Sequence, residues 1–210
     1  MSSIADSFAW PFQSPGWFGK MILQGLIAII PIIGWIAMAG WMMNNIDNLR
    51  AGRRELAPAG FHLGRGAGVF FVFLIYGVVL GIPSIILGAA GSSSHSAGLS
   101  ALGNAISFAL RLFLIFLTPS IILFVYRGGF SAGFDFNGIW GMATSNTANS
   151  ITAALVVFVA NLIGGLGAIL CLVGLLFTIP YSSAITAGVV AWYEQVMVGP
   201  STASPSSPAV

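Results

Sequence analysis

The chain has 210 residues, of which 57% are hydrophobic and only 6% are charged. A soluble domain has about 25% charged residues, because its surface must face water. Seven Lys and Arg residues with five Asp and Glu residues are too few to cover a soluble protein of this length. The composition excludes an ordinary soluble domain and predicts an all-α, polytopic membrane protein. No basic cluster interleaved with aromatic residues accompanies the net charge of +2, so no nucleic-acid partner is expected.

A transmembrane helix needs about 20 mostly apolar residues. This length predicts about five spans, at residues 21–43, 68–90, 105–126, 150–166 and 168–194. The last two come from one apolar run that is too long for a single crossing, and the sequence GGLG at 164–167 is where the chain is expected to reverse. Residues 21–196 therefore form one predicted transmembrane domain.

The first predicted span, residues 21–43, has two alternatives. Pro31 and Gly34 would split it into the two short arms of a re-entrant hairpin, which leaves four full crossings. A cleavable signal peptide is the other alternative, because Ala37-Met38-Ala39 resembles a small-residue cleavage site behind an apolar core. The apolar run continues through Trp41-Met42-Met43, which argues against cleavage.

The basic residues predict the orientation of the chain. The loop at 44–66 holds four of the seven cations, and the loop at 89–104 holds none. By the positive-inside rule, the basic loop and the C-terminus are expected on the cytoplasmic side of a cytoplasmic (inner) membrane. A single first span would place the N-terminus outside, whereas a hairpin would return it to the inside.

Three segments outside the spans have a character of their own. Residues 1–20 alternate aromatic residues with Pro and Gly, which is typical of an interfacial segment. Residues 134–146 have apolar side chains at helical spacing and predict a short amphipathic helix lying on the membrane, with Asp135 or Asn137 as its N-cap. The Ser- and Pro-rich tail at 197–210 is expected to be disordered.

The pentapeptide PSIIL occurs twice, and each copy begins with a proline inside an apolar run. Proline removes a backbone hydrogen bond and kinks a helix, which a membrane bundle tolerates. The predicted kinks are at Pro31, Pro83, Pro119 and Pro180. Small residues four positions apart permit close helix packing. The predicted packing residues are Gly77, Gly81, Ala160, Gly164, Ala184 and Gly188.

The sequence predicts no catalytic site, no cofactor and no metal site. His62 and His95 lie in loops expected on opposite sides of the membrane, so they cannot share a metal ion. No motif of a phosphate-binding loop, a zinc protease or a nucleophile elbow is present. Cys171, the single cysteine, is expected to be a small buried hydrophobe. An intramembrane enzyme using the hydroxyl groups at 181–183 ranks lowest among the functional hypotheses.

Arg111 is the unusual charged residue, because it lies about two turns into the span predicted at 105–126. A cation at the centre of a membrane helix costs about 2.5–3.5 kcal/mol on insertion scales. The side chain could face a polar path or an anionic headgroup. It could instead extend toward the outer surface and bond to Asn161, which lies at a similar depth. At the inner end, Glu194 is expected to pair with Arg127 or with an arginine of the first loop.

The order of these features resembles that of a known family. The stretch FAWPFQSPGWFGKMILQGLIAIIPIIGWIAMAGWMMNNIDNLRAGRREL, then a proline, then LGRGAGVFFVFLIYGVVLGIP, resembles the membrane-protein family called domain of unknown function 4013. GGFSAGFDF and CLVGLLFTIPY are similar to its second half, so the resemblance covers roughly residues 7–196. The sequence PAGF at 58–61 and AWYEQ at 191–195 depart from the family pattern, which has an acidic turn and closing His and basic residues there. The resemblance implies an architecture and no activity.

Two functional hypotheses remain. The first is a scaffold or accessory component of a membrane assembly, whose partners are the lipid bilayer and other membrane subunits or a second copy of the chain. The alternative is a small transporter or channel, also as a homo-oligomer. It predicts that Arg111, Asn161, Tyr181 and Ser182 face one water-filled interior.

Overall fold

The computed structural model describes residues 3–168 and 171–199, and helices are the regular secondary structure found there. The predicted tail at 197–210 lies almost entirely outside the described residues, and so does the side chain of Cys171. The elements, in chain order, are α1 (Asp6–Ala9), the 3-10 helix η1 (Trp10–Gln13), α2 (Trp17–Ala28), α3 (Ile33–Arg50), α4 (Leu63–Ser93), α5 (Ala97–Ala132), α6 (Phe136–Ser145), α7 (Thr147–Leu166) and α8 (Cys171–Val198).

Four of the described helices are long and apolar enough to cross a membrane. They are α4, α5, α7 and the Gly174–Val198 part of α8. The all-helical class is therefore confirmed, whereas the count of five spans is not. Helix α6 begins after Asp135, whose side chain accepts a hydrogen bond from the Gly138 amide at 3.0 Å, which confirms the predicted short helix and its N-cap.

The predicted span at 21–43 forms two helices, α2 and α3, joined by a tight turn. Pro31 lies in this turn and cannot continue a helix, and Ile32 adopts a positive φ of 64°. Helix α2 has 12 residues, which is about 18 Å of helix against a hydrocarbon core of about 30 Å. The chain therefore breaks near Pro31 into the 12-residue α2 and the 18-residue α3, in place of one continuous span.

The expected proline kinks are not confirmed. Pro83, Pro119 and Pro180 lie inside α4, α5 and α8, which continue as helices on both sides of them. The irregular residue in α5 is Gly129, with φ 76° and ψ −165°. Glycine reaches this conformation without steric cost, so α5 bends at its end near Arg127, well away from Pro119.

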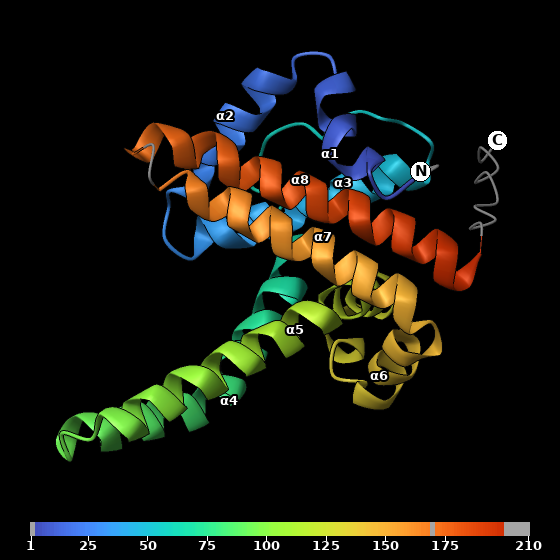
Figure 1. The fold of residues 1–210 in the computed structure, drawn as a ribbon. Coiled ribbons are helices and arrows are strands. Elements are labelled where there is room, and N and C mark those ends of the chain that lie inside the picture. Colours follow the sequence, from blue (N-terminus) through green and yellow to red (C-terminus); the bar gives the residue numbers. More distant parts are fainter. Residues whose placement is uncertain (1–2, 169–170, 200–210) are drawn as a thin grey trace.

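Figure 1 shows how the helices are arranged. Helices α7 and α8 lie side by side, and the N-terminal helices α1–α3 cover one face of α8. Helices α4 and α5 form a long hairpin that projects from the other side of this base at a clear angle to α7. With 31 and 36 residues, α4 and α5 exceed the length of one perpendicular crossing, so in a bilayer they would tilt or extend beyond the hydrocarbon core.

The irregular segment at 51–62 is held against the N-terminal helices by polar side chains. Trp41 Nε1 donates to the Ala57 carbonyl at 2.9 Å, and Lys20 Nζ donates to the Leu56 carbonyl at 2.9 Å. These bonds satisfy backbone groups that no helix satisfies. They also place the start of α2 at the same end of the molecule as the basic loop.

The aromatic segment at the N-terminus is only partly exposed. Phe18 is 59% exposed, as an interfacial residue would be, but Trp10 is fully buried against α8. Trp10 Nε1 donates to the Ala184 carbonyl at 3.2 Å. A Cβ atom at Gly188 would lie 2.9 Å from this nitrogen, so the glycine provides the space for the indole. The segment is thus a packed part of the fold.

Candidate functional site

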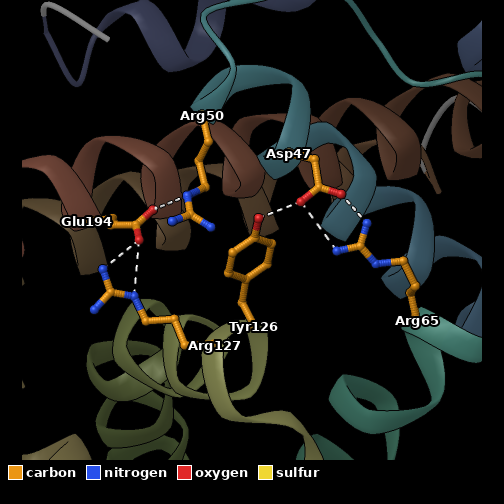
Figure 2. A network of polar contacts seen from close by, with 6 residues as sticks. All are labelled: Asp47, Arg50, Arg65, Tyr126, Arg127 and Glu194. Atoms are coloured by element: carbon orange, nitrogen blue, oxygen red, sulfur yellow. Dashed lines mark hydrogen bonds and ion pairs between the residues drawn. The ribbon is translucent and has the colours of Figure 1, made fainter. Parts of the chain in front are cut away.

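Six polar residues meet where the ends of four helices converge (Figure 2). We call them the charge network: Asp47, Arg50, Arg65, Tyr126, Arg127 and Glu194. Helix α3 supplies two of them, α5 supplies two, and α4 and α8 supply one each. The charge network therefore joins residues that are far apart in the sequence, from Asp47 to Glu194, at one end of the molecule.

Glu194 is the centre of one half of the network. Its side chain is 2% exposed and faces two arginines. Arg127 Nη2 donates to Oε1 at 2.6 Å, and Arg50 Nε lies 3.0 Å from Oε2. A buried carboxylate is tolerated only when its charge is compensated in this way. The expected pairing of Glu194 is confirmed, and it includes both Arg127 and a residue of the first loop.

Asp47 is the centre of the other half. Tyr126 OH donates to Asp47 Oδ1, and Arg65 holds both carboxylate oxygens, with 3.3 Å between Nη2 and Oδ1. Arg65 Nη1 also donates to Asn44 Oδ1 at 3.0 Å. The bidentate geometry fixes the start of α4 against the end of α3.

Arg50 connects the two halves. Its guanidinium carbon lies 4.8 Å from the centre of the Tyr126 ring, within the range of a cation–π contact. Burial alone would lower the pKa of Arg50, but its interactions with Tyr126, Glu194 and Asp47 raise the pKa above its ordinary value. Arg50 therefore keeps its charge, and the network joins the ends of the four helices.

A neutral polar cluster lies next to this network in the core. Tyr193 is fully buried, and its hydroxyl is bonded to Ser120 Oγ at 3.0 Å and to Ser150 Oγ at 2.9 Å. The three residues come from α8, α5 and α7. Sequence reasoning missed this cluster, because single hydroxyl groups in apolar helices do not reveal which of them face one another.

Arg111 and Asn161 line one cavity of about 310 Å³ between α3, α4, α5, α7 and α8. Thr118 and Thr186 add hydroxyl groups to its wall, and the rest of the lining is mainly apolar. Asn161 Nδ2 donates to the Val157 carbonyl of its own helix at 2.9 Å. The structure thus brings the two residues of the proposed polar pair to one cavity, where Asn161 bonds to its own backbone.

The other two residues of the transporter hypothesis lie elsewhere. Tyr181 OH donates to the Phe8 carbonyl at 3.0 Å and stacks on Phe177, on the side of α8 that the N-terminal segment covers. Ser182 packs against α7, with its Cβ atom 3.3 Å from the Cβ position of Gly164. Arg111 and Asn161 therefore share a cavity that Tyr181 and Ser182 do not line.

The predicted packing residues differ in their surroundings. Ala160 and Ala184 are fully buried, and Gly188 contacts the N-terminal segment. Gly77 and Gly81 in α4 have open space where a Cβ atom would lie. Closer helix contacts occur at Gly66, which faces the backbone of α3, and at Gly25, which faces the backbone of α8.

The structure places the two histidines at opposite ends of α4, His62 before its first residue and His95 after its last. Over residues 3–168 and 171–199, no three His, Cys, Asp or Glu side chains are grouped so that they could hold a metal ion. The expectations of no cofactor and no enzymatic activity stay predictions.

The architecture and the site agree with an integral membrane protein in which several apolar helices are clamped at one end. The family model described as "Protein of unknown function (DUF4013)" matches residues 23–173. This match covers most of the chain, so the chain belongs to that family, as its sequence features suggest. No curated protein and no solved structure matches the chain.

Proposed function

We propose that the protein is a scaffold or accessory subunit of a membrane assembly, and that the α4–α5 hairpin is the part that contacts another membrane protein. In this proposal, the basic loop, the N-terminal helices and the end of α8 lie on the cytoplasmic side of a cytoplasmic membrane. The protein contributes contacts and no catalytic step.

The projecting hairpin is the observation that carries the proposal. In the most apolar 18-residue stretch of α4, only 11% is buried within the chain, compared with 50% in the corresponding stretch of α8. Large apolar side chains such as Val78, Ile85 and Ile86 point away from the rest of the fold. Gly77 and Gly81 lie on the same helix and line a cavity between α4 and α5. The exposed apolar side chains are therefore the part of α4 that is available to a partner.

The clamped base gives the hairpin a fixed anchor. Arg65 joins the first turn of α4 to Asp47, and Tyr126 and Arg127 join the last turns of α5 to α3 and α8. The hairpin is packed against α3, α7 and α8 over its clamped part. Its far part projects from the base (Figure 1) and presents its surface in a defined direction. This arrangement is better suited to contact with a partner protein than to forming a closed pore.

Position-specific photocrosslinking in the native membrane tests the proposal. A photoreactive residue at Val78 or Ile85 reports on the hairpin, and one at Leu162 of α7 is a matched control, since Leu162 is also exposed and apolar. We expect a discrete protein adduct from the hairpin positions that the α7 position does not give. Adducts of equal intensity from α4 and α7, or adducts with lipid alone at both, would contradict the scaffold role.

The cavity at Arg111 and Asn161 favours a second candidate function, a small transporter. This candidate predicts solute flux through purified protein in liposomes, and a loss of that flux in Arg111→Ala. Flux that persists unchanged in the variant, or no flux for any tested anion, would remove this candidate.

A further inference from the structure

Arg111 differs from the other cations of the chain. Each of the other six makes a hydrogen bond or ion pair: Lys20 with Leu56, Arg50 and Arg127 with Glu194, Arg53 with Asn48, Arg54 with Asp6, and Arg65 with Asp47. Arg111 makes neither with any residue in the described part of the chain. Arg111 is exposed at the surface of the fold, on a helix long and apolar enough to cross a membrane. Where that surface faces hydrocarbon, a guanidinium with five N–H donors requires acceptors.

Two cavities meet at Arg111. The first, of about 310 Å³, contains Asn161 at its polar part and is otherwise lined mainly by apolar residues such as Val69 and Ile122. The second, of about 180 Å³, lies between α4 and α5 and includes Ser107. Among the residues that the structure describes, no Asp or Glu lines either cavity. Arg111 therefore carries a positive charge that the cavity walls do not neutralise.

The remaining polar groups in the larger cavity are suited to an anion. Asn161 Nδ2 gives one hydrogen to the Val157 carbonyl and keeps a second N–H. The hydroxyl groups of Thr118 and Thr186 donate to carbonyls of their own helices. The free donors are thus those of Arg111 and Asn161, which can share the oxygens of one carboxylate or phosphate.

The position of Arg111 favours an anion that carries an apolar tail. Arg111 lies 16 residues before Arg127 on α5, which is about 24 Å along the helix from the clamped end. A tilted helix shortens this distance across the membrane, so Arg111 lies within or at the edge of a hydrocarbon core about 30 Å thick. Cavities of about 300 Å³ with mostly apolar walls and a few polar groups are typical ligand sites.

We propose that the cavity beside Arg111 binds the oxyanion of an acidic amphiphile, such as an anionic phospholipid, with its acyl chain along the apolar wall. Arg111 and Asn161 hold the phosphate or carboxylate oxygens. This inference is independent of the scaffold and transporter proposals, because a bound lipid requires neither a protein partner nor passage across the membrane.

Native mass spectrometry of the full chain in mild detergent tests the site. The probes are phosphatidylglycerol, phosphatidylcholine and inorganic phosphate, each added separately to wild type, Arg111→Gln, Asn161→Leu and Arg53→Gln. Arg53→Gln is the matched control, since it removes an exposed cation that is bonded to Asn48 and lines neither cavity. Elution as a single species and an unchanged melting temperature show that each variant is folded.

We expect wild type and Arg53→Gln to retain phosphatidylglycerol in preference to phosphatidylcholine. Arg111→Gln should weaken phosphatidylglycerol binding by at least about tenfold, and Asn161→Leu should weaken it less. Binding of phosphatidylglycerol that depends on Arg111 supports the proposal and identifies a lipid headgroup as the source. Arg111-dependent binding of inorganic phosphate without phosphatidylglycerol would overturn the amphiphile and identify a free anion as the ligand. Equal binding of phosphatidylglycerol and phosphatidylcholine, or anionic binding unchanged in Arg111→Gln, would overturn the proposal.

Discussion

Arg127 Nη2 and Glu194 Oε1, from residues 67 positions apart, lie 2.6 Å from each other at the ends of α5 and α8. Glu194 is 2% exposed, whereas Arg127 is 38% exposed. The carboxylate therefore depends on its arginines more than they depend on it, because an arginine near the surface can be hydrated in their absence.

Replacing Arg127 should therefore destabilise the protein. Arg127→Ala leaves Glu194 buried with Arg50 as its remaining cation, and we expect the free energy of unfolding to fall by about 1–2 kcal/mol. Glu194→Gln removes the buried charge itself and should cost less. Thermal unfolding in detergent measures both effects.

A double-mutant cycle provides the control. Arg127→Ala combined with Glu194→Gln should cost less than the sum of the single changes, by about 0.5–3 kcal/mol. Arg53→Ala, which removes an exposed arginine outside the network, should change the melting temperature little. Strict additivity would show that the pair contributes no coupling.

Removing the Tyr193 hydroxyl should also lower the stability of the protein. Tyr193→Phe leaves the buried hydroxyl groups of Ser120 and Ser150 without their shared partner, which should cost about 1–3 kcal/mol. The triple variant Tyr193→Phe, Ser120→Ala, Ser150→Ala removes all three polar groups and should recover part of that loss. Unfolding in detergent compares the two variants, and a triple variant less stable than Tyr193→Phe would contradict the account.

Two glycines of α4 should respond in opposite ways to the same substitution. A Cβ atom at Gly66 would overlap with the Ile36 carbonyl oxygen of α3, so Gly66→Ala should force α3 and α4 apart and reduce the melting temperature. Gly77→Ala meets open space, and alanine favours helix by about 1 kcal/mol, so it should be neutral or stabilising in purified protein. Similar losses in both variants would show that α4 packs differently.

Much of the fold could be predicted from the sequence, because hydrophobic runs and capping residues act locally. The apolar runs at 68–90, 105–126 and 150–166 lie within α4, α5 and α7, and the Asp135 cap lies where it was expected. The chain also reverses after α7, where Gly167 caps the helix. These features need no knowledge of which helices are neighbours.

The features of the fold and the site that the sequence did not predict depend on which helices are neighbours. Asp47 and Tyr126 are 79 residues apart, and nothing local indicates that their side chains meet. The full lengths of α4 and α5 were also underestimated, because their ends contain Gly and Ser residues that hydropathy does not assign to a span. The turn at Pro31 was foreseen only as an alternative, since proline is compatible with both a kink and a break.

The most direct test of the account concerns the side on which the N-terminus lies. With four crossing helices and an α2–α3 turn that does not cross, we expect Ser3 and Gly52 on one side of the membrane and Ser94 on the other. Single cysteines at these positions, in a Cys171→Ala background, can be labelled with a membrane-impermeant maleimide in sealed vesicles of one known orientation. The account predicts that Ser3→Cys and Gly52→Cys share the same accessibility and that Ser94→Cys shows the opposite one. Labelling of Ser3→Cys together with Ser94→Cys would contradict it and would require the first apolar run to cross the membrane.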